Sequence, residues 1–481
     1  MAEVIERERL LGQLREAREW DVLVIGGGAT GLGIALDAAS RGFRTALIDA
    51  RDFAGGTSSR STKLIHGGVR YLAQGNVKLV REALAERALL LSNAGGLVHP
   101  LKFVVPCYRP FERELLRVGL GAYDALAGKR GIGDTHWLSR SETTAALPGV
   151  KTKNLQGGVA YWDAQFDDAR LAIALMRTAV RLGAVAINYV EAHQIALESG
   201  RLSSIIARDV PTGERFEMRA KAVFNATGVW ADDVRRRVNG SSEALLTLSR
   251  GSHIVLPGSY LPASTAMMIP RTPDRRVLFA IPWHGHAMLG TTDVVAERPS
   301  WNPQASAAEI DFILDTAHGY FETPPSVTDV VATFAGLRPL FSPRAARATR
   351  TISREHAIVI EHGNLLTVVG GKWTTYRRMA LDAIDLGVQA GLLEQRPSRT
   401  AKIKLDVDAS IEAACDAARA ASLVSVDDQG NNGAVKEFVT AATRYEQALY
   451  ADDVISRRLR VDTLDQATAL RIRPQVERLL R

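Results

Sequence analysis

The sequence predicts an α/β protein in which three junctions of strand, glycine turn and helix converge. Apolar strands are expected over 21–25, 222–225 and 365–369, and each leads into a turn that contains glycine. Between the second and third junctions lie segments of alternating pattern that are typical of antiparallel strands: "SHIVLP", "RRVLFAIPW" and "HAMLGTTDV". From about Pro397 the chain becomes rich in helix formers. These observations predict an α/β core, a second sheet and a helical C-terminal part.

The first junction carries the pattern G-x-G-x-x-G at Gly26, Gly28 and Gly31, at the start of a helix expected over 29–41. Gly26 permits the tight turn, Gly28 lets the backbone approach a pyrophosphate, and Gly31 lets the helix pack closely on the strand. The N-terminus of the helix offers unpaired N–H groups and the positive end of its dipole. The junction therefore predicts a phosphate-binding site.

A second strand, expected over 43–49, ends in Asp49, where a carboxylate can accept hydrogen bonds from ribose hydroxyls. An acid rather than an arginine at this position favours FAD or NAD over NADP. The later junctions, at Thr227-Gly228 in "NATGVWAD" and at Gly370-Gly371 in "GGKWTTYR", can converge with the first on one extended ligand, and the Gly370-Gly371 turn is expected to supply backbone donors.

Composition limits the class of protein. The 481 residues carry a net charge of +7, which favours anionic partners without selecting one. No nucleic-acid-binding motif is recognisable. The two cysteines, Cys107 and Cys415, lie far apart, so neither a disulfide framework nor a metal site is expected. The N-terminal segment is charged throughout and predicts no signal peptide.

In the order "IGGGATGLGIALDAASRG", "TSSRSTKLIHGGVRYL", "FDDARL", "NATGVWAD", "RGSHIVLP", "GTTDV", "GLRPL" and "GGKWTTYR", the chain resembles the FAD-dependent glycerol-3-phosphate dehydrogenases, the respiratory flavoprotein type. The resemblance covers about residues 18–395. It implies a discontinuous Rossmann-like FAD-binding domain of the glutathione-reductase/D-amino-acid-oxidase-like superfamily, a substrate domain with a mixed or antiparallel sheet, and a short helical C-terminal cap.

The resemblance also implies domain limits. The FAD-binding domain is expected over 17–90, 163–236 and 345–395, and the substrate domain over 91–162 and 237–344. The cap is expected over 396–481 and looks shorter than is usual in the family.

The segment "TSSRSTKLIHGGVRYL" is expected, from the resemblance, to lie along the flavin. Its hydroxyls would bond the pyrophosphate or the flavin edge, and its glycines would let the backbone pass close to the ring. The expected cofactor-binding residues are Gly26, Gly28, Gly31, Asp49, Thr57, Ser58, Ser59, Ser61, Gly67, Thr227, Gly228 and Gly371.

The end of this segment is expected to reach the substrate. The resemblance places Arg338 beside the C2 oxygen and makes His66 and His253 the candidates for general base, with the choice between them open; alternatively, each histidine could be structural. The expected catalytic residues are His66, His253, Arg338 and Lys372. The expected substrate-binding residues are Arg70, Tyr71, Arg354 and Thr374.

The implied reaction is the oxidation of sn-glycerol 3-phosphate to dihydroxyacetone phosphate, by hydride transfer from C2 to N5 of FAD, with electrons passed to a quinone. Three alternatives stay open: an oxidase that uses O2 and releases H2O2, a related FAD oxidoreductase of amino or hydroxy acids, and a non-catalytic flavin-binding subunit. The family also implies peripheral contact with an anionic membrane, at the cytoplasmic face of the inner membrane, and a homodimer is possible. The mixed apolar and basic stretch over 109–130 is the candidate membrane segment, with an ordinary packed helix as the alternative.

Overall fold

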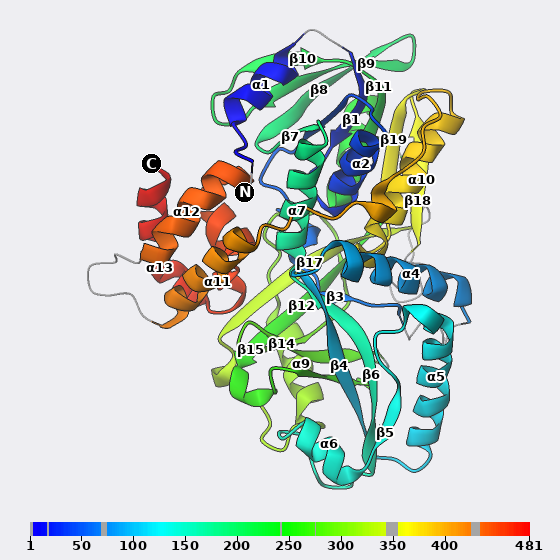
Figure 1. The fold of residues 1–481 in the computed structure, drawn as a ribbon, viewed down its shortest axis with the longest axis vertical. Helices are drawn as coiled ribbons and strands as arrows, with labels where there is room; N and C mark the ends of the chain where they lie inside the picture. The colour runs from blue at the N-terminus through cyan, green and yellow to red at the C-terminus, as the bar shows by residue number, and fades with distance from the viewer. Residues whose placement is uncertain are drawn as a thin grey trace.

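A computed structural model of the protein describes residues 3–16, 19–68, 75–240, 243–274, 276–342, 355–424 and 433–481. Figure 1 shows three parts: a sheet covered by helices at the top, a large sheet below it, and a group of C-terminal helices at one side. The chain passes between the upper and lower parts several times, so neighbouring elements of each part are often distant in sequence.

The upper sheet has six strands in the order β18-β19-β11-β1-β2-β7. Their bounds are β1 Trp20–Ile25, β2 Thr45–Ile48, β7 Val185–Ile187, β11 Ala220–Asn225, β18 His356–Glu361 and β19 Leu365–Gly370. Neighbouring strands run parallel except for β18, which pairs antiparallel with β19. In β1, Val22, Leu23 and Val24 are completely buried, because a parallel sheet is covered on both of its faces.

Helices α2 (Ala29–Ser40), α7 (Asp168–Arg181) and α10 (Tyr376–Gln389) lie together against this sheet (Figure 1). The run from Leu32 to Ala39 in α2 is buried because the helix is enclosed by the sheet and by its two neighbours. Helix α7 begins at the "FDDARL" motif, where the Asp167 carboxylate accepts hydrogen bonds from two backbone N–H groups, both at 3.1 Å.

The lower sheet has ten strands, of which eight follow the order β16-β12-β15-β14-β13-β4-β6-β3, while β17 pairs with β12 and β5 pairs with β6. The bounds are β3 Leu64–Ile65, β4 Val98–Cys107, β5 His136–Leu138, β6 Gly157–Phe166, β12 Leu246–Pro257, β13 Thr265–Ile269, β14 Leu278–Trp283, β15 His286–Gly290, β16 Val294–Ala296 and β17 Ala332–Phe341. The pairs are antiparallel except that β13 runs parallel to β4. A separate three-stranded sheet is formed by β8 Val190–Glu198, β9 Arg201–Asp209 and β10 Arg215–Met218.

The remaining helices surround these sheets. They are α1 Arg7–Arg15, α4 Val77–Asn93, α5 Glu112–Ala127, α6 Arg140–Ala146, α8 Ala231–Asn239 and α9 Ala307–His318, and, in the C-terminal helical unit, α11 Ala409–Val424, α12 Gly433–Glu446 and α13 Gln466–Leu480. A π-helical turn, η9 (Asp453–Arg458), lies between α12 and α13. The C-terminal unit has its own apolar core, which includes Phe438 and Ile472.

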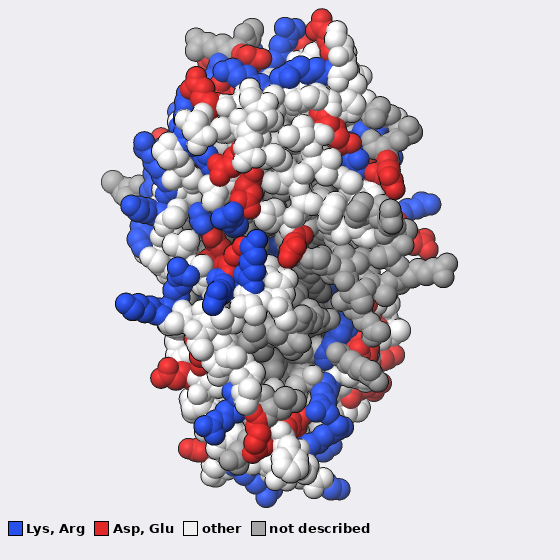
Figure 2. Space-filling model, turned by 90° about the vertical axis from the view of Figure 1, so that its right-hand side faces the viewer, with Lys and Arg blue, Asp and Glu red and all other residues white. Residues whose placement is uncertain are grey.

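The predicted fold class is confirmed: a parallel nucleotide-binding sheet, a mostly antiparallel second sheet and a helical C-terminal unit are all present. The domain limits given above stay a prediction. The surface seen in Figure 2 mixes Lys and Arg with Asp and Glu. No helix within the described ranges has both the length and the apolar character needed to cross a bilayer.

Candidate functional site

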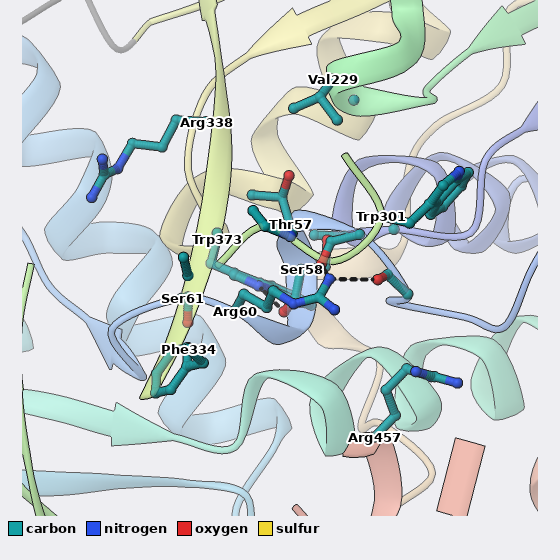
Figure 3. Close-up of a pocket in the computed structure, with 18 of the residues that line it drawn as sticks. Thr57, Ser58, Arg60, Ser61, Val229, Trp301, Phe334, Arg338, Trp373 and Arg457 are labelled. Atoms are coloured by element: carbon teal, nitrogen blue, oxygen red, sulfur yellow. Dashed lines mark hydrogen bonds between the residues drawn. The ribbon is translucent and has the colours of Figure 1, made fainter. Parts of the chain in front are cut away.

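A cavity of about 2000 Å³ lies where the upper sheet, the lower sheet and the C-terminal unit meet. Figure 3 shows residues from all three parts around it, with Arg338 on one side and Trp301 and Arg457 on the other. The lining also includes the glycine turn before α2, the loop after β2, and the turns that follow β11 and β19. The three predicted junctions therefore open into one space.

The glycines of the first turn are required by close contacts. A Cβ on Gly31 would stand 1.8 Å from the carbonyl oxygen of Gly26, and Gly26 itself has a φ of 109°. A Cβ on Gly28 would stand 3.0 Å from Oγ of Ser58. The backbone N–H of Ala29, in the first turn of α2, donates to that Ser58 oxygen at 2.9 Å. Ser58 therefore stands at the positive end of the helix, where a phosphate group binds.

Asp49 lies at the end of β2 and accepts hydrogen bonds from the N–H groups of Gly27 (2.5 Å) and Arg51 (2.8 Å). Loss of water around the carboxyl raises its pKa to about 7, although both N–H groups act in the opposite direction. Because Asp49 lines the cavity, its free lone pairs are available to ribose hydroxyls. Beside it, Arg51 lies 4.3 Å over the ring of Trp301, which stacks on Trp230 at 3.6 Å.

The hydroxyls of the loop after β2 have different partners. Thr57 lines the cavity and its hydroxyl donates to the carbonyl of Leu337 at 2.6 Å, which ties this loop to β17. The Ser61 hydroxyl donates to Asp168 at 2.7 Å. Ser59 is buried, and its carbonyl accepts a hydrogen bond from Lys63 at 2.7 Å. Ser59 and Ser61 thus help to hold the shape of the loop.

The backbone at His66 and Gly67 is held from two sides. The Thr374 hydroxyl lies 3.3 Å from both the N–H and the carbonyl of His66, and the N–H of Gly67 donates to the Tyr123 hydroxyl at 2.8 Å. A Cβ on Gly67 would stand 2.5 Å from that hydroxyl. Tyr123 in turn donates to Asp163, which is paired with Arg87 at 2.6 Å.

The sequence reasoning missed this Tyr123–Asp163–Arg87 group. A signal for it exists in "YWDAQF", where Asp163 is a charged residue in an otherwise apolar strand, and a buried charge requires a partner.

His253 and Arg338 come from the paired strands β12 and β17 of the lower sheet. His253 is 1% exposed, stacks on Phe334 with ring centroids 4.6 Å apart, and has Nε2 3.0 Å from the Thr62 hydroxyl. Burial, with Lys63 and Arg338 nearby, holds the pKa of His253 well below its usual value, so its imidazole is neutral.

The Arg338 guanidinium is fixed by three oxygens: it donates to the Thr291 hydroxyl at 2.9 Å, and to the Ser249 hydroxyl and the Thr292 carbonyl at 3.2 Å each. Its charge is therefore held in one orientation at the wall of the cavity.

Most of the other predicted residues also line the cavity. Thr227 and Gly228 follow β11, and Gly371, Lys372 and Thr374 follow β19, around the short turn η7 (Trp373–Thr375). The Trp373 indole N–H donates to the Ser58 carbonyl at 2.9 Å, which joins this turn to the phosphate end of α2. The predicted substrate residues Arg70, Tyr71 and Arg354 lie outside the described residues.

The residues present fit an extended dinucleotide. A carboxylate stands at one side of the glycine turn, a helix N-terminus with Ser58 lies beside it, and a glycine-containing backbone held by Thr374 and Tyr123 follows. Such a cradle, at the carboxyl ends of parallel strands, defines the class of Rossmann-like dinucleotide-binding proteins.

The chain belongs to the FAD dependent oxidoreductase family, whose model matches residues 21–377. The predicted cofactor, FAD, is thereby confirmed. The chain is 42% identical over 409 residues to the mitochondrial glycerol-3-phosphate dehydrogenase of Bos taurus, a match over 82% of this chain and 56% of that enzyme. It is 40% identical to a probable glycerol-3-phosphate dehydrogenase of Encephalitozoon cuniculi, over 81% of this chain and 64% of the relative. The chain thus spans between half and two thirds of these curated relatives.

Two solved structures extend the comparison. The glycerol-3-phosphate dehydrogenase of Bacillus halodurans, complexed with FAD, has a TM-score of 0.73 and 27% identity, and the match covers 98% of this chain and 97% of that one. The FAD-bound L-alpha-glycerophosphate oxidase of Mycoplasma pneumoniae has a TM-score of 0.63 at 17% identity, over 81% of this chain and all of that one, which shows a common fold. The predicted resemblance to the glycerol-3-phosphate dehydrogenases is confirmed.

Proposed function

We propose that the protein oxidises sn-glycerol 3-phosphate to dihydroxyacetone phosphate. The observation that carries the proposal is that a fixed guanidinium, Arg338, a neutral imidazole, His253, and Lys372 all line the FAD cavity. The similarity to glycerol-3-phosphate dehydrogenases over most of the chain supports the same substrate. When bound, FAD supplies the hydride acceptor.

The residues of the chain have separate tasks in this proposal. Lys372, with Arg70, Tyr71 and Arg354 as further expected ligands and Thr374 beside them, binds the substrate and its phosphate dianion, since charge-assisted hydrogen bonds to phosphate are the strong ones. Arg338 donates to the C2 oxygen and stabilises the negative charge that develops there. A neutral imidazole can accept the hydroxyl proton, and both His66 and His253 line the cavity.

The proposal is tested by the visible spectrum of the purified protein under anaerobic conditions. We expect the flavin absorption to bleach when sn-glycerol 3-phosphate is added, and to persist with glycerol or lactate, which lack the phosphate. Bleaching by an amino acid or a hydroxy acid instead would replace the proposed substrate. A flavin band that no substrate of these classes changes would support a non-catalytic flavin-binding subunit.

We further propose a quinone as the electron acceptor. The reduced protein should be reoxidised anaerobically by a soluble quinone analogue. Rapid reoxidation by oxygen, with stoichiometric H2O2, would instead establish an oxidase.

We also propose that the protein contacts an anionic membrane at the cytoplasmic face of the inner membrane. The candidate segment is α5 with the residues directly before and after it. Phe111 is 82% exposed and Val118 73% exposed, and basic residues follow at Lys129 and Arg130. Flotation with anionic liposomes at low salt should carry the protein upward, and a Phe111→Ser/Val118→Ser variant should stay at the bottom. A homodimer is also proposed, and analytical ultracentrifugation measures it directly.

A further inference from the structure

The C-terminal helical unit contacts the phosphate end of the cofactor cavity through three arginines that lie close together in the sequence. Arg457 and Arg458 end the π-helical turn η9, and Arg460 follows with a left-handed backbone (φ 65°). Arg458 and Arg460 are among the largest fully buried side chains described, and Arg457 lines the cavity (Figure 3). Buried arginines are costly unless each is paired, so their partners indicate what they stabilise.

Two of the arginines share one partner, Asp52, at the start of the loop that follows β2. Nε of Arg457 lies 2.5 Å from the Asp52 carboxylate, and Arg458 donates to both of its oxygens. The amide of Asn188 donates to the same carboxylate at 3.0 Å. Asp52 is 1% exposed; burial acts to raise its pKa, but Arg458 and Arg457 outweigh this and hold the pKa below the usual value. The beginning of the loop is therefore anchored to the C-terminal unit.

The third arginine holds the other end of the loop. Arg460 donates to the Ser59 carbonyl at 2.6 Å and to the Asp168 carboxylate at 3.1 Å. Lys63 donates to the same two groups, at 2.7 Å each. Asp168 also accepts from the N–H of Ser61 at 3.0 Å. The loop over 52–59 is thus held at both ends by cations, and the C-terminal unit provides a cation at each end.

Between these two anchors lies the part of the loop that lines the cavity. Ser58 receives the N–H of Ala29 at the start of α2, and Gly55, Gly56 and Thr57 line the cavity. The carbonyls of Gly55 and Gly56 accept hydrogen bonds from Arg60 at 2.9 and 3.3 Å. Because a trans peptide points its N–H away from its carbonyl, the N–H groups of Gly56 and Thr57 are directed away from the Arg60 guanidinium. Displacement of either anchor would change this arrangement.

We propose that the C-terminal helical unit contributes to FAD binding. Arg457, Arg458 and Arg460 position the loop over 52–59, which binds the diphosphate of FAD. Docking of the unit and binding of FAD therefore stabilise each other. The three arginines are positioning residues. Such coupling is reciprocal: the factor by which docking of the unit raises the affinity for FAD equals the factor by which bound FAD raises the docking equilibrium of the unit. The proposal rests on the FAD cofactor and does not depend on the identity of the substrate.

The test compares Arg457→Gln and Arg460→Gln with Arg478→Gln. Arg478 belongs to the same unit, in α13, but its side chain is exposed. FAD is removed, and the dissociation constant for FAD is measured by titration of each apo-protein, well below its melting temperature. The melting temperature of each variant is measured with and without FAD. Arg457→Lys and Arg460→Lys keep the charge and serve as rescue variants.

We expect the dissociation constant for FAD to rise at least about tenfold in Arg457→Gln and Arg460→Gln, and less than about twofold in Arg478→Gln. The rise in melting temperature caused by FAD should shrink in the two Gln variants, and the Lys variants should recover part of it. In the unmodified protein, FAD should slow amide hydrogen exchange in η9 and α11–α13.

A different pattern would overturn the proposal. If the arginines only stabilise the fold, the melting temperatures with and without FAD fall by the same amount and the affinity for FAD is unchanged. Unchanged hydrogen exchange in the C-terminal unit on FAD binding would contradict it without any variant. This measurement also decides the question should one of the Gln variants fail to fold.

Discussion

At the scale of single residues, Asp49 links cofactor binding to pH. Its pKa of about 7 means that much of the carboxyl is protonated in the apo-protein near neutrality. Ribose hydroxyls donate to the ionised form, so binding lowers this pKa and releases a proton. The affinity for FAD should therefore rise with pH and level off above pH 7.

Titration of the apo-protein with FAD between about pH 5.5 and about pH 8.5 measures this effect. The Asp49→Asn variant should bind less tightly and show no such dependence. The stability of the apo-protein changes with pH in the opposite direction. Because the pKa of Asp49 in the folded protein lies above its unfolded value of 3.8, the contribution of Asp49 to stability is greatest at low pH and is lost as pH rises through about 7. If the affinity for FAD depends on pH equally in the unmodified protein and in Asp49→Asn, another group causes the pH effect.

Arg338 tests whether geometry or charge matters at the substrate. Its guanidinium is fixed by Ser249, Thr291 and Thr292, and a lysine ammonium cannot make the same set of contacts. Arg338→Lys should slow anaerobic reduction of the flavin by roughly 100- to 1,000-fold, the usual loss for one preorganised donor, with FAD affinity unchanged. If Arg338→Lys reduces the flavin at the normal rate, Arg338 acts only through its charge.

At the scale of elements, the contact between β1 and α2 depends on Gly31. A Cβ there would overlap the Gly26 carbonyl oxygen at 1.8 Å, so alanine must push the helix away from the strand. We expect Gly31→Ala to cost about 1–3 kcal/mol in the free energy of unfolding, as overpacking does, and to weaken FAD binding at least tenfold. Urea unfolding and FAD titration measure the two effects.

Gly12 provides a matched control, because it also lies inside a helix, α1, but a Cβ there has nothing within 4 Å. Gly12→Ala should stabilise the protein by about 0.5–1 kcal/mol and leave FAD binding alone. A Gly31→Ala protein that binds FAD normally would show that the helix can move without disturbing the phosphate site.

At the scale of the whole molecule, the upper and lower parts are joined across the cavity by Trp301. This residue lies between β16 and α9, and stacks on Trp230 after β11 and under Arg51 after β2. Aromatic stacking is worth about 0.5–1.5 kcal/mol, and a cation–π contact about 0.5–2 kcal/mol. Trp301→Ala should therefore speed FAD dissociation about tenfold, since ~1.4 kcal/mol corresponds to that factor.

Release of FAD can be followed by the recovery of flavin fluorescence after dilution. Trp301→Phe keeps an aromatic ring and should release FAD at nearly the normal rate. If Trp301→Ala also releases FAD at the normal rate, the stack is not a barrier to exit.

Much of the fold and part of the site were predictable because their signals are local. The strand, glycine turn and helix around Gly26, Gly28 and Gly31 are contiguous, and the acid at Asp49 follows within one βαβ unit. His253 on β12 and Arg338 on β17 could be predicted only from motifs shared with a family, because neither "RGSHIVLP" nor "GLRPL" indicates with which strand it pairs.

The α/β class, the phosphate-binding turn and the acid that follows it could be predicted from the amino-acid sequence, because backbone geometry and local hydrogen bonding depend on near neighbours. The hydrogen bonds of Ser61 to Asp168, of Gly67 to Tyr123 and of Arg460 to Ser59 became visible only in the folded chain. Such pairs are 56 to 401 residues apart in the chain. Their contacts follow from the packing of three separate parts around one cavity, which no local pattern specifies.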